Sequence, residues 1–361
     1  MVAVHAPEVT GLPRPPSGRR GTPRGRTVGV RLAVLALVLG LLGLAVLASV
    51  AFGTRPVSLA EVFSALTGTG GLGEGSVVAE AAVRQRIPRT VLAMIIGASL
   101  AMAGAAMQAV TRNPLADPGI LGVSGGAALA VVVGIVFFGV TGPVGYIVMA
   151  MGGAAAAAVL VYTIGSLGRG GASPLKLALA GAAMSAAFTS LVSAILLPRV
   201  DVMVTFRFWQ IGGVGGAQWE RIGAVAPFLL AGAVLVVGMA SAMNSLALGD
   251  DLAVGLGVRV ARTRLLASVG AVVLTGAATA IAGPIGFVGL VVPHAVRLLV
   301  GPDHRWLLPI SALAGAALLT AADVVGRVVA RPAEIEVGII TALIGAPVFI
   351  ALVRRLKVRE L

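Results

Sequence analysis

The sequence predicts an all-α polytopic membrane protein, and three observations support this fold class. The chain of 361 residues is 58% hydrophobic and only 11% charged, whereas a soluble domain carries about a quarter charged residues. Its hydrophobic residues gather in long runs without Asp, Glu, Lys or Arg, and a helix needs about 20 such residues to cross a bilayer. Glycine is abundant, with 50 residues, which favours close helix packing in lipid.

Eight runs without these charged residues mark the expected spans. They are Leu32–Thr54, Thr90–Thr111, Pro118–Gly168, Leu177–Pro198, Ile222–Gly249, Leu265–Val296, Trp306–Ala322 and Val337–Val353. The third run is long enough for two helices, and we expect a break at Thr141-Gly142-Pro143. The sixth run contains a second helix breaker, Gly283-Pro284-Ile285-Gly286.

The eight runs correspond to nine or ten helices, because the third run holds two and the sixth holds one or two. The charge of the two ends indicates ten. Residues 1–31 and the segment 354–359 are both rich in arginine, so both termini are expected on the cytoplasmic side, which requires an even number of spans. Residues 1–31 then form a disordered basic tail, and residues 32–361 form the ten-helix transmembrane domain. The net charge of +13 reflects this topology rather than binding to nucleic acid.

Four segments carry more specific residue patterns. The first includes Arg86-Ile87-Pro88-Arg89, Gly97–Leu100, Gly104–Gln108 and the run Thr111–Ala127 with Asn113-Pro114 and Asp117-Pro118. The others are Gly283–His294, Ala322–Arg327 and Gly338–Phe349. In this order they resemble the permease family of iron–siderophore, heme and vitamin B12 importers, the type II ABC importers. The resemblance covers about residues 30–355.

This resemblance implies a transport subunit of the cell membrane, with ten helices and no enzymatic activity or cofactor of its own. The implied cargo is an iron(III)–siderophore or a related chelate such as heme or vitamin B12. The implied partners are a second permease subunit (identical or related), two ATP-binding subunits that hold ATP and Mg²⁺, and an extracytoplasmic substrate-binding protein. The sequence is consistent with ATP binding on a separate subunit, because neither Lys176 nor Lys357 lies in the Gly-Lys-Ser/Thr pattern of a phosphate-binding loop.

The segment from Asn244 to Arg264 is too charged to span a membrane and too apolar for a free loop. We expect two short helices here, separated by Gly249 and ending at Gly255–Gly257. An apolar face on the cytoplasmic side needs a protein partner, and the resemblance implies contact with the ATPase. A helix resting on lipid is the alternative. The candidate coupling residues are Asn244, Leu246, Leu248, Gly249, Asp250, Asp251, Leu252, Leu256 and Gly257.

Arginines gather on the side expected to face outward, before the second span and after the ninth: Arg84, Arg86, Arg89, Arg327 and Arg331. One interpretation is interfacial anchoring by snorkelling side chains. The other is a basic surface that docks an acidic binding protein through Arg86, Arg89 and Arg327. At Ile335-Glu336 the chain departs from the Leu-Pro usual in the family, and an outward Glu336 would weaken that surface.

The candidate substrate path lies on the fifth span, where Ser185, Thr189 and Ser193 recur every four residues and share one helix face. Hydrogen bonding between helices is the equally open alternative for these hydroxyls. The resemblance places an inner gate at the turn Ala172–Leu175, which contains Ser173.

An ion-coupled secondary transporter is the alternative function. Such carriers place an acid or a histidine at mid-membrane, whereas every acid here falls at a predicted span end or in a loop. Asp323 is best explained as the partner of Arg327, and His294 as a satisfied structural group near Arg297. No catalytic spacing of serine, histidine or acids lies within a span, and the absence of cysteine excludes disulfides and thiolate chemistry.

Overall fold

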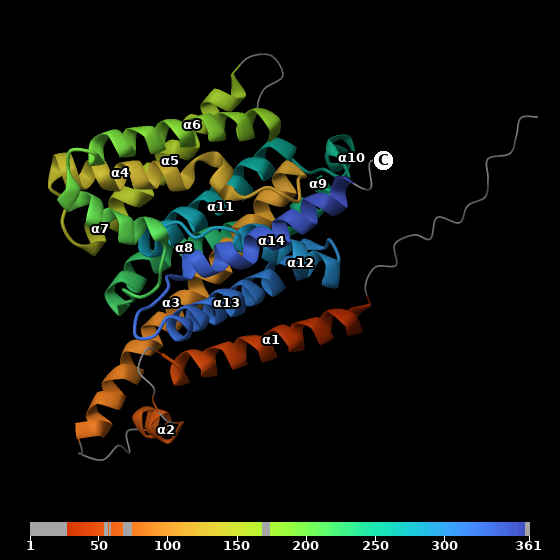
Figure 1. Cartoon of the computed structure of the whole chain (residues 1–361). Helices are drawn as coiled ribbons and strands as arrows, with labels where there is room; N and C mark the ends of the chain where they lie inside the picture. Colours follow the sequence, from red (N-terminus) through yellow and green to blue (C-terminus); the bar gives the residue numbers. More distant parts are fainter. Residues whose placement is uncertain (1–26, 54–56, 58, 68–73, 168–173, 358–361) are drawn as a thin grey trace, which may run out of the picture.

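The computed structural model describes residues 27–53, 57, 59–67, 74–167 and 174–357. The regular elements in these ranges are all helices (Figure 1). In chain order they are α1 (Val28–Ala51), α2 (Leu59–Thr67), α3 (Glu74–Thr111), the 3₁₀ helix η1 (Pro118–Leu121), α4 (Val123–Phe138), α5 (Pro143–Ser166), α6 (Pro174–Leu196), α7 (Val200–Ile211), α8 (Trp219–Gly238), α9 (Ala240–Leu246), α10 (Asp250–Gly255), α11 (Val260–Ala282), α12 (Val288–Val300), α13 (His304–Val329) and α14 (Val337–Lys357). Most of the predicted tail, residues 1–26, lies outside the described residues.

Apolar helices lie where the sequence predicts spans, which confirms a multi-pass, all-helical membrane protein. Seven of them are long and apolar enough to cross a membrane, namely α1, α3, α5, α6, α8, α11 and α13. Three more, α4, α12 and the Val337–Ala351 part of α14, are apolar but shorter. The breaks predicted at Gly142-Pro143 and Gly283-Pro284 are confirmed. The short helices α2 and α7 were not predicted.

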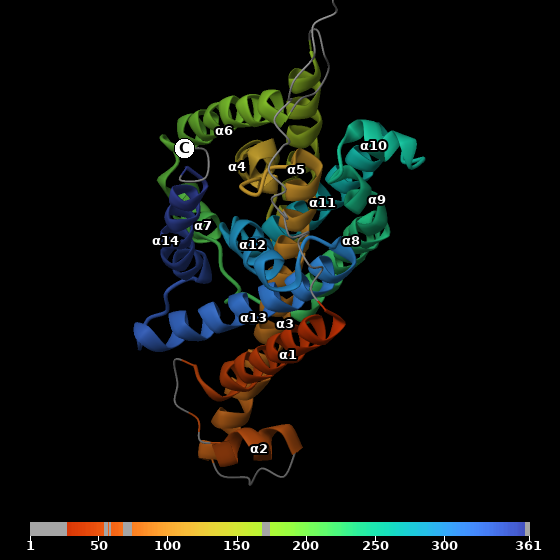
Figure 2. The same ribbon diagram turned by 90° about the vertical axis from the view of Figure 1, so that its right-hand side faces the viewer.

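The long helices run roughly side by side between two ends of the molecule (Figure 1). We name these the α10 end, at the right of Figure 1, and the α2 end, at the lower left; Figure 2 views the molecule from the α10 end. The start of α1 and the last turn of α14 both lie at the α10 end. The described chain therefore begins and ends at the same end of the bundle.

Helix α3 lies at the centre of the bundle and packs against α1, α11, α12 and α13 (Figure 2). Gly97 of α3 faces Gly315 of α13, and Gly104 faces Gly289 of α12. A Cβ atom at any of these four positions would collide with the facing backbone. Small residues therefore set the spacing of the central helices, as the composition predicts.

Helices α4 and α12 are short, with 16 and 13 residues, because both begin at mid-depth. Gly289 in the first turn of α12 packs on Gly104, which lies about 10 Å from the end of α3 at Thr111 by the rise of a helix. The carboxylate of Asp117, just before η1, also lies beside Gly289. Non-helical backbone, residues 112–117 and 283–287, leads into each short helix from one end. Such backbone is tolerated at membrane depth where it is enclosed by protein.

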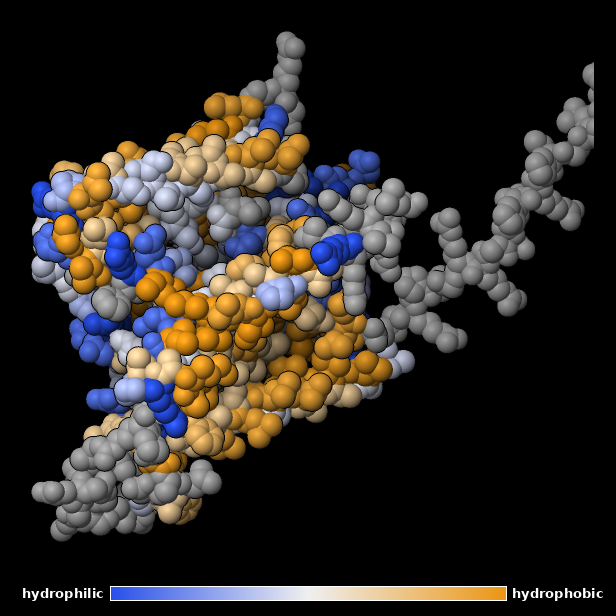
Figure 3. Space-filling model, viewed as in Figure 1, coloured by the Kyte–Doolittle hydropathy of each residue, from blue (hydrophilic) through white to orange (hydrophobic). Residues whose placement is uncertain are grey.

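Hydrophobic side chains cover the middle of the surface over α1, α13 and α14, and hydrophilic ones gather toward the two ends (Figure 3). Leu44 and Leu47 of α1 and Leu343 of α14 are exposed apolar side chains of these helices. An exposed apolar surface of this kind fits a lipid environment or another membrane subunit.

Candidate functional site

Helices α9 and α10, with the turns that follow them, form a small unit at the α10 end, named here the coupling segment (residues 240–257). The predicted pair of short helices is confirmed, since α9 ends at Leu246 and α10 begins at Asp250. Gly249 and Gly257 have φ values of 115° and 79°, in the region that glycine adopts without steric cost. These two glycines make the turns on either side of α10.

Asn244 ties α9 to the start of α13. Its Oδ1 accepts a hydrogen bond from the backbone N–H of His304 at 2.8 Å, and its Nδ2 donates to Asp303 at 2.7 Å. Asp303 also pairs with Arg31 of α1 at 3.6 Å. Burial raises the pKa of Asp303, but its hydrogen bonds from Asn244 and the Arg305 backbone, together with Arg31, outweigh burial and hold that pKa below its usual value. The ionised Asp303 therefore links α1, α9 and α13, an arrangement we name the Asn244 clamp.

Asp250 ties the start of α10 to two long helices. Its Oδ1 accepts hydrogen bonds from Arg112, directly after α3, and from Arg264 of α11 at 3.0 Å. Arg112 also donates from Nε to the backbone oxygen of Leu246 at 2.8 Å. The φ of Arg112 is 52°, a left-handed conformation that costs a non-glycine residue roughly 1–2 kcal/mol. We name this arrangement the Asp250 clamp; it holds the coupling segment to α3 and α11.

The coupling segment also presents apolar side chains to the surroundings. Leu248, Leu252 and Leu256 are 58%, 61% and 62% exposed, and we name them the leucine face. Leu246 is fully buried, so its predicted place on this face is wrong and it belongs to the packing of α9 instead. Asp251 is exposed beside Leu252. Three exposed leucines on a segment this short form a surface that a partner would cover.

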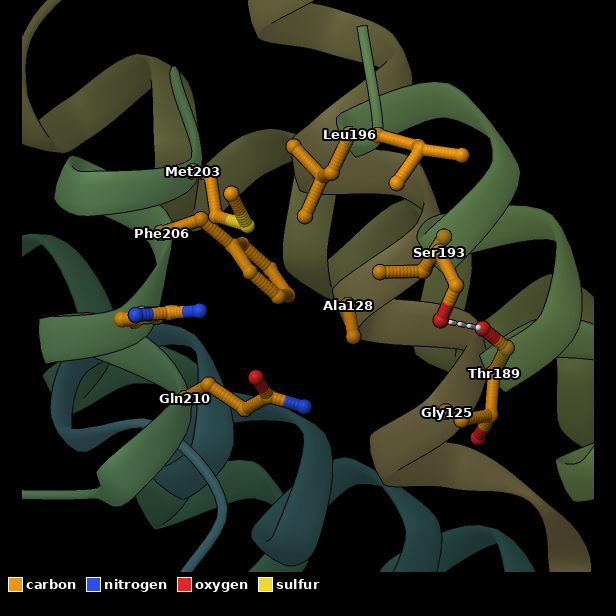
Figure 4. Close-up of a pocket in the computed structure, with 11 residues that line it drawn as sticks. Gly125, Ala128, Thr189, Ser193, Leu196, Met203, Phe206 and Gln210 are labelled. Atoms are coloured by element: carbon orange, nitrogen blue, oxygen red, sulfur yellow. Dashed lines mark hydrogen bonds between the residues drawn. The ribbon is translucent and has the colours of Figure 1, made fainter. Parts of the chain in front are cut away.

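A cavity of about 240 Å³ lies between α4, α6 and α7. Thr189 and Ser193, two of the predicted path residues, line it from α6, and Figure 4 shows Phe206 and Gln210 of α7 on the other side. Arg207 of α7 contributes a charge to the lining, so the wall is mostly, but not wholly, uncharged.

Two of the three hydroxyls of the α6 stripe bond to their own helix. Thr189 donates to the backbone oxygen of Ser185 at 2.8 Å. Ser193 donates to the backbone oxygen of Thr189 at 2.9 Å (Figure 4). These two donors are therefore satisfied without a bond to another helix, and the stripe presents a surface of low polarity. Ser173, the predicted gate residue, lies outside the described residues.

Two arginines predicted to dock a partner, Arg86 and Arg327, are engaged inside the protein. Their exposed fractions are 7% and 2%. Arg86 donates to the backbone oxygens of Val50 and Ala51 at 2.8 and 2.9 Å. Arg327 donates to the Ser49 hydroxyl at 2.7 Å. Both side chains thus hold the end of α1 against α3 and α13.

Arg89, the third predicted docking residue, is also paired within the chain. It contacts Asp323 at 2.8 Å and Glu334 at 2.7 Å. Asp323 in turn pairs with Arg327 at 3.0 Å, as the sequence predicts. We name Arg86, Arg89, Arg327 and Asp323 the arginine cluster. A docking role for its arginines stays a prediction, because the contacts described are internal ones.

Glu336 packs against the protein rather than projecting outward, the orientation that would weaken the outer basic surface. It is only partly exposed, and its carboxylate lies against Gly213. Burial raises the pKa of Glu336, and the nearby charges of Glu334 and Asp323 raise it further against the opposing charge of Arg89. In this position Glu336 contributes less negative charge to the outer surface than a fully exposed carboxylate would.

Residues 41–355 match the FecCD transport family. The chain belongs to this family. Its relatives include the ferric enterobactin transport system permease protein FepD of Escherichia coli, 45% identical over 90% of this chain and 95% of FepD. The hemin transport system permease protein HmuU of Yersinia pestis is 40% identical over 75% of this chain and 82% of HmuU.

A solved structure also resembles this FecCD-family chain. It is described as a metal-chelate type ABC transporter in an inward-facing conformation. The two chains align with a TM-score of 0.77 and 30% identity, over 90% of this chain and 99% of the other. The helical fold of this chain is therefore that of an ABC transporter permease.

Sequence reasoning missed several residues at the sites of this FecCD-family chain. Arg112 and Asp303, which complete the two clamps, were not predicted, although Asp303 stands in the N-cap position of α13 and such residues commonly begin helices. His294 was expected to be a satisfied polar group. That expectation is wrong for one nitrogen, because Nδ1 is buried without a hydrogen-bond partner among the described residues.

Proposed function

We propose that this chain is the transmembrane permease subunit of an ATP-binding cassette importer that carries an iron(III)–siderophore, or a related chelate such as heme or vitamin B12, into the cytoplasm. ATP is hydrolysed on a separate subunit. The observation that carries the proposal is the leucine face, an exposed apolar surface on a segment tied to long apolar helices by two polar clamps. The relatives FepD and HmuU, named for ferric enterobactin and hemin, support the cargo class.

In this proposal ten helices cross the membrane, with the α10 end and both termini in the cytoplasm. The seven long apolar helices and the three shorter ones support this count. Where α4 and α12 fall short of about 20 residues, the non-helical segments that precede them complete the crossing. The leucine face then lies on the cytoplasmic side, where an ATPase subunit is accessible.

The clamps supply a route by which a partner's movement reaches the membrane. An ATPase subunit that covers the leucine face pulls or rotates the coupling segment when it binds ATP. Asp250 passes that displacement to α3 and α11, and Asn244 passes it to α13 and α1. Since α3 is the central helix of the bundle, a small displacement there reaches most of its neighbours.

A second permease subunit packs, in this proposal, against the apolar surfaces of α6 and α14. Leu179 and Leu191 of α6 and Leu343 of α14 are at least half exposed. The substrate path lies between the two subunits and is lined by the stripe of Ser185, Thr189 and Ser193. Because two of these hydroxyls are satisfied within α6, the wall binds a large chelate weakly and lets it pass.

The external binding protein docks at the α2 end. Arg84, whose side chain is 73% exposed, and Arg331, which is also exposed, are the arginines that an acidic partner meets first. Contact with Arg86, Arg89 or Arg327 requires the arginine cluster to open. Docking therefore begins on the outer arginines and reaches the predicted ones only if the cluster rearranges.

Reconstitution into liposomes tests the source of energy. The chain alone should accumulate no chelate under proton, sodium or potassium gradients, whereas its assembly with the ATPase subunit and a loaded binding protein should accumulate it when ATP is supplied. Accumulation by the solitary chain under an ion gradient would establish the alternative, an ion-coupled secondary transporter, and overturn the proposal.

The leucine face is tested in the same assembly. Leu252→Asp should abolish co-purification of the ATPase subunit, because a charge in an apolar interface core costs more than about 2 kcal/mol at such positions. Leu252→Met keeps the surface apolar and should retain the subunit. Equal retention by both variants would show that the leucine face is not the contact.

A further inference from the structure

A second cavity, of about 210 Å³, lies at mid-depth in the bundle, between η1, the second half of α11 and the start of α12. Four polar side chains line it: Asp117, Ser124, Thr275 and Thr279. The only polar atoms in these four side chains are oxygens, and none of the lining residues is basic. We name this the Asp117 cavity. It is separate from the cavity of Figure 4, which lies between α4, α6 and α7.

Asp117 brings a carboxylate into this cavity without a cationic partner. One of its oxygens accepts the backbone N–H of Gly119 at 2.8 Å, and the other lies beside Gly289. None of the ion pairs among the described residues involves Asp117. A charged group at this depth needs a partner, because neither lipid nor an apolar interior solvates it. A single backbone N–H does not neutralise the charge.

Thr275 is a second, independent sign of an occupant. It is 4% exposed, lies on α11 and lines the cavity. Its Oγ1 has no hydrogen-bond partner within the described part of the chain, although buried hydroxyls normally have one. A carboxylate without a counter-charge and a hydroxyl without a partner thus share one cavity.

We propose that the Asp117 cavity binds an alkali-metal cation, held by the Asp117 carboxylate and the Thr275 hydroxyl within a lining completed by Ser124 and Thr279. Oxygen ligands suit hard cations, and one carboxylate balances one positive charge. The volume leaves room for water to complete the coordination shell. The cation joins η1, which leads into α4, to the start of α12, and so holds together the two helices that begin at mid-depth.

In this proposal the cation has a structural role separate from ATP-driven transport, and the site is tested by binding rather than by uptake. The purified full-length chain is titrated in lipid nanodiscs with NaCl or KCl against N-methyl-D-glucamine chloride at constant ionic strength. Tryptophan fluorescence reports the unfolding temperature, and ²²Na⁺ scintillation proximity reports binding directly. Na⁺ or K⁺ should raise the unfolding temperature in a saturable manner that the bulky organic cation does not reproduce.

Two matched pairs of variants assign the effect. Asp117→Asn keeps an N-cap acceptor for Gly119 but loses the charge, and it should weaken cation binding at least about tenfold, which corresponds to 1.4 kcal/mol. Thr275→Val keeps the shape but loses the hydroxyl, and it should weaken binding in the same direction. The controls Asp201→Asn and Thr163→Val change exposed residues away from the cavity and should bind as the wild type does.

Each other outcome overturns the proposal. Identical behaviour in all three salts shows that no alkali cation binds. A pH-dependent unfolding temperature that Asp117→Asn removes, without any difference between the salts, shows that a proton is the occupant. If Asp117→Asn does not fold, the Thr275→Val titration decides alone, and wild-type affinity in that variant rejects the site. A negative result here leaves the permease function intact, since ATP-driven uptake is measured separately.

Discussion

The two ends of the molecule both carry arginines paired with acids, but the pairs differ in their surroundings. At the α2 end, Arg327 and Asp323 have side chains only 2% and 1% exposed. At the α10 end, the side chains of Arg112 and Asp250 are 37% and 45% exposed. The first pair lies inside the helix packing, whereas the second lies on a surface beside exposed leucines.

This difference separates two roles for the same kinds of side chain. An enclosed pair cannot lose one partner without leaving the other charge uncompensated, so it fixes the arrangement of α1, α3 and α13. A half-exposed pair is solvated and contributes modestly to stability, so the Asp250 clamp is able to shift when a partner moves the coupling segment. The α2 end is therefore built to hold its helices in place, and the α10 end to transmit movement.

The largest expected effect is at the enclosed pair. Asp323→Ala leaves Arg89 and Arg327 without their shared carboxylate and should lower the free energy of unfolding by about 3–5 kcal/mol. Thermal unfolding of the purified chain, followed by tryptophan fluorescence, measures the loss. Glu80→Ala is the matched control, because it breaks an exposed pair with Arg84 that is worth at most about 1 kcal/mol. Equal stability of the two variants would show that the arginine cluster does not hold the helices.

The positions of the apolar helices were predictable, but the lengths of two of them were not. Charge-free runs locate spans because lipid excludes charged side chains, and Gly-Pro pairs locate the breaks because neither residue favours a helix interior. The start of α12 at mid-depth depends instead on the approach of Gly289 to Gly104. These residues are far apart in sequence, and no local pattern indicates that they meet.

The candidate sites also combine features that local sequence signals predict with features that depend on contacts between distant residues. The two short helices of the coupling segment follow from local signals, the glycines at 249 and 257. The burial of the arginine cluster depends on partners such as Asp323, 234 residues from Arg89, so the sequence located the arginines at one end without showing which of them face inward. The sequence shows Asp117 in an Asp-Pro pair, and only the fold shows that this residue lies at mid-depth.

The exposed clamp should affect coupling more than stability. Asp250→Ala frees α10 from α3 and α11 and should lower ATP-driven uptake by the full assembly, in line with changes of about 0.5–2 kcal/mol seen along coupling routes. Asp201→Ala, an exposed carboxylate at the start of α7, is the control and should transport normally. The exchanged pair Arg112→Asp with Asp250→Arg should recover part of the uptake. Wild-type uptake by Asp250→Ala would remove the clamp from the coupling route.

The smallest effect is expected at the outermost arginines. Arg84→Glu with Arg331→Glu reverses two exposed charges at the α2 end, and surface changes of this kind alter stability by less than about 0.5 kcal/mol. The double variant should need more binding protein for half-maximal uptake, most clearly at low salt, because exposed charges act mainly on the association rate and salt screens them. The maximal rate at saturating binding protein should stay the same.

The same charge change at the other end separates docking from net charge. Arg262→Glu with Arg354→Glu alters exposed residues at the α10 end and should leave the apparent affinity for the binding protein unchanged. If both double variants lower that affinity equally, the effect belongs to the overall charge of the chain. If neither lowers it at any salt concentration, docking does not begin at Arg84 and Arg331, and the contrast between an enclosed cluster and an exposed docking rim fails.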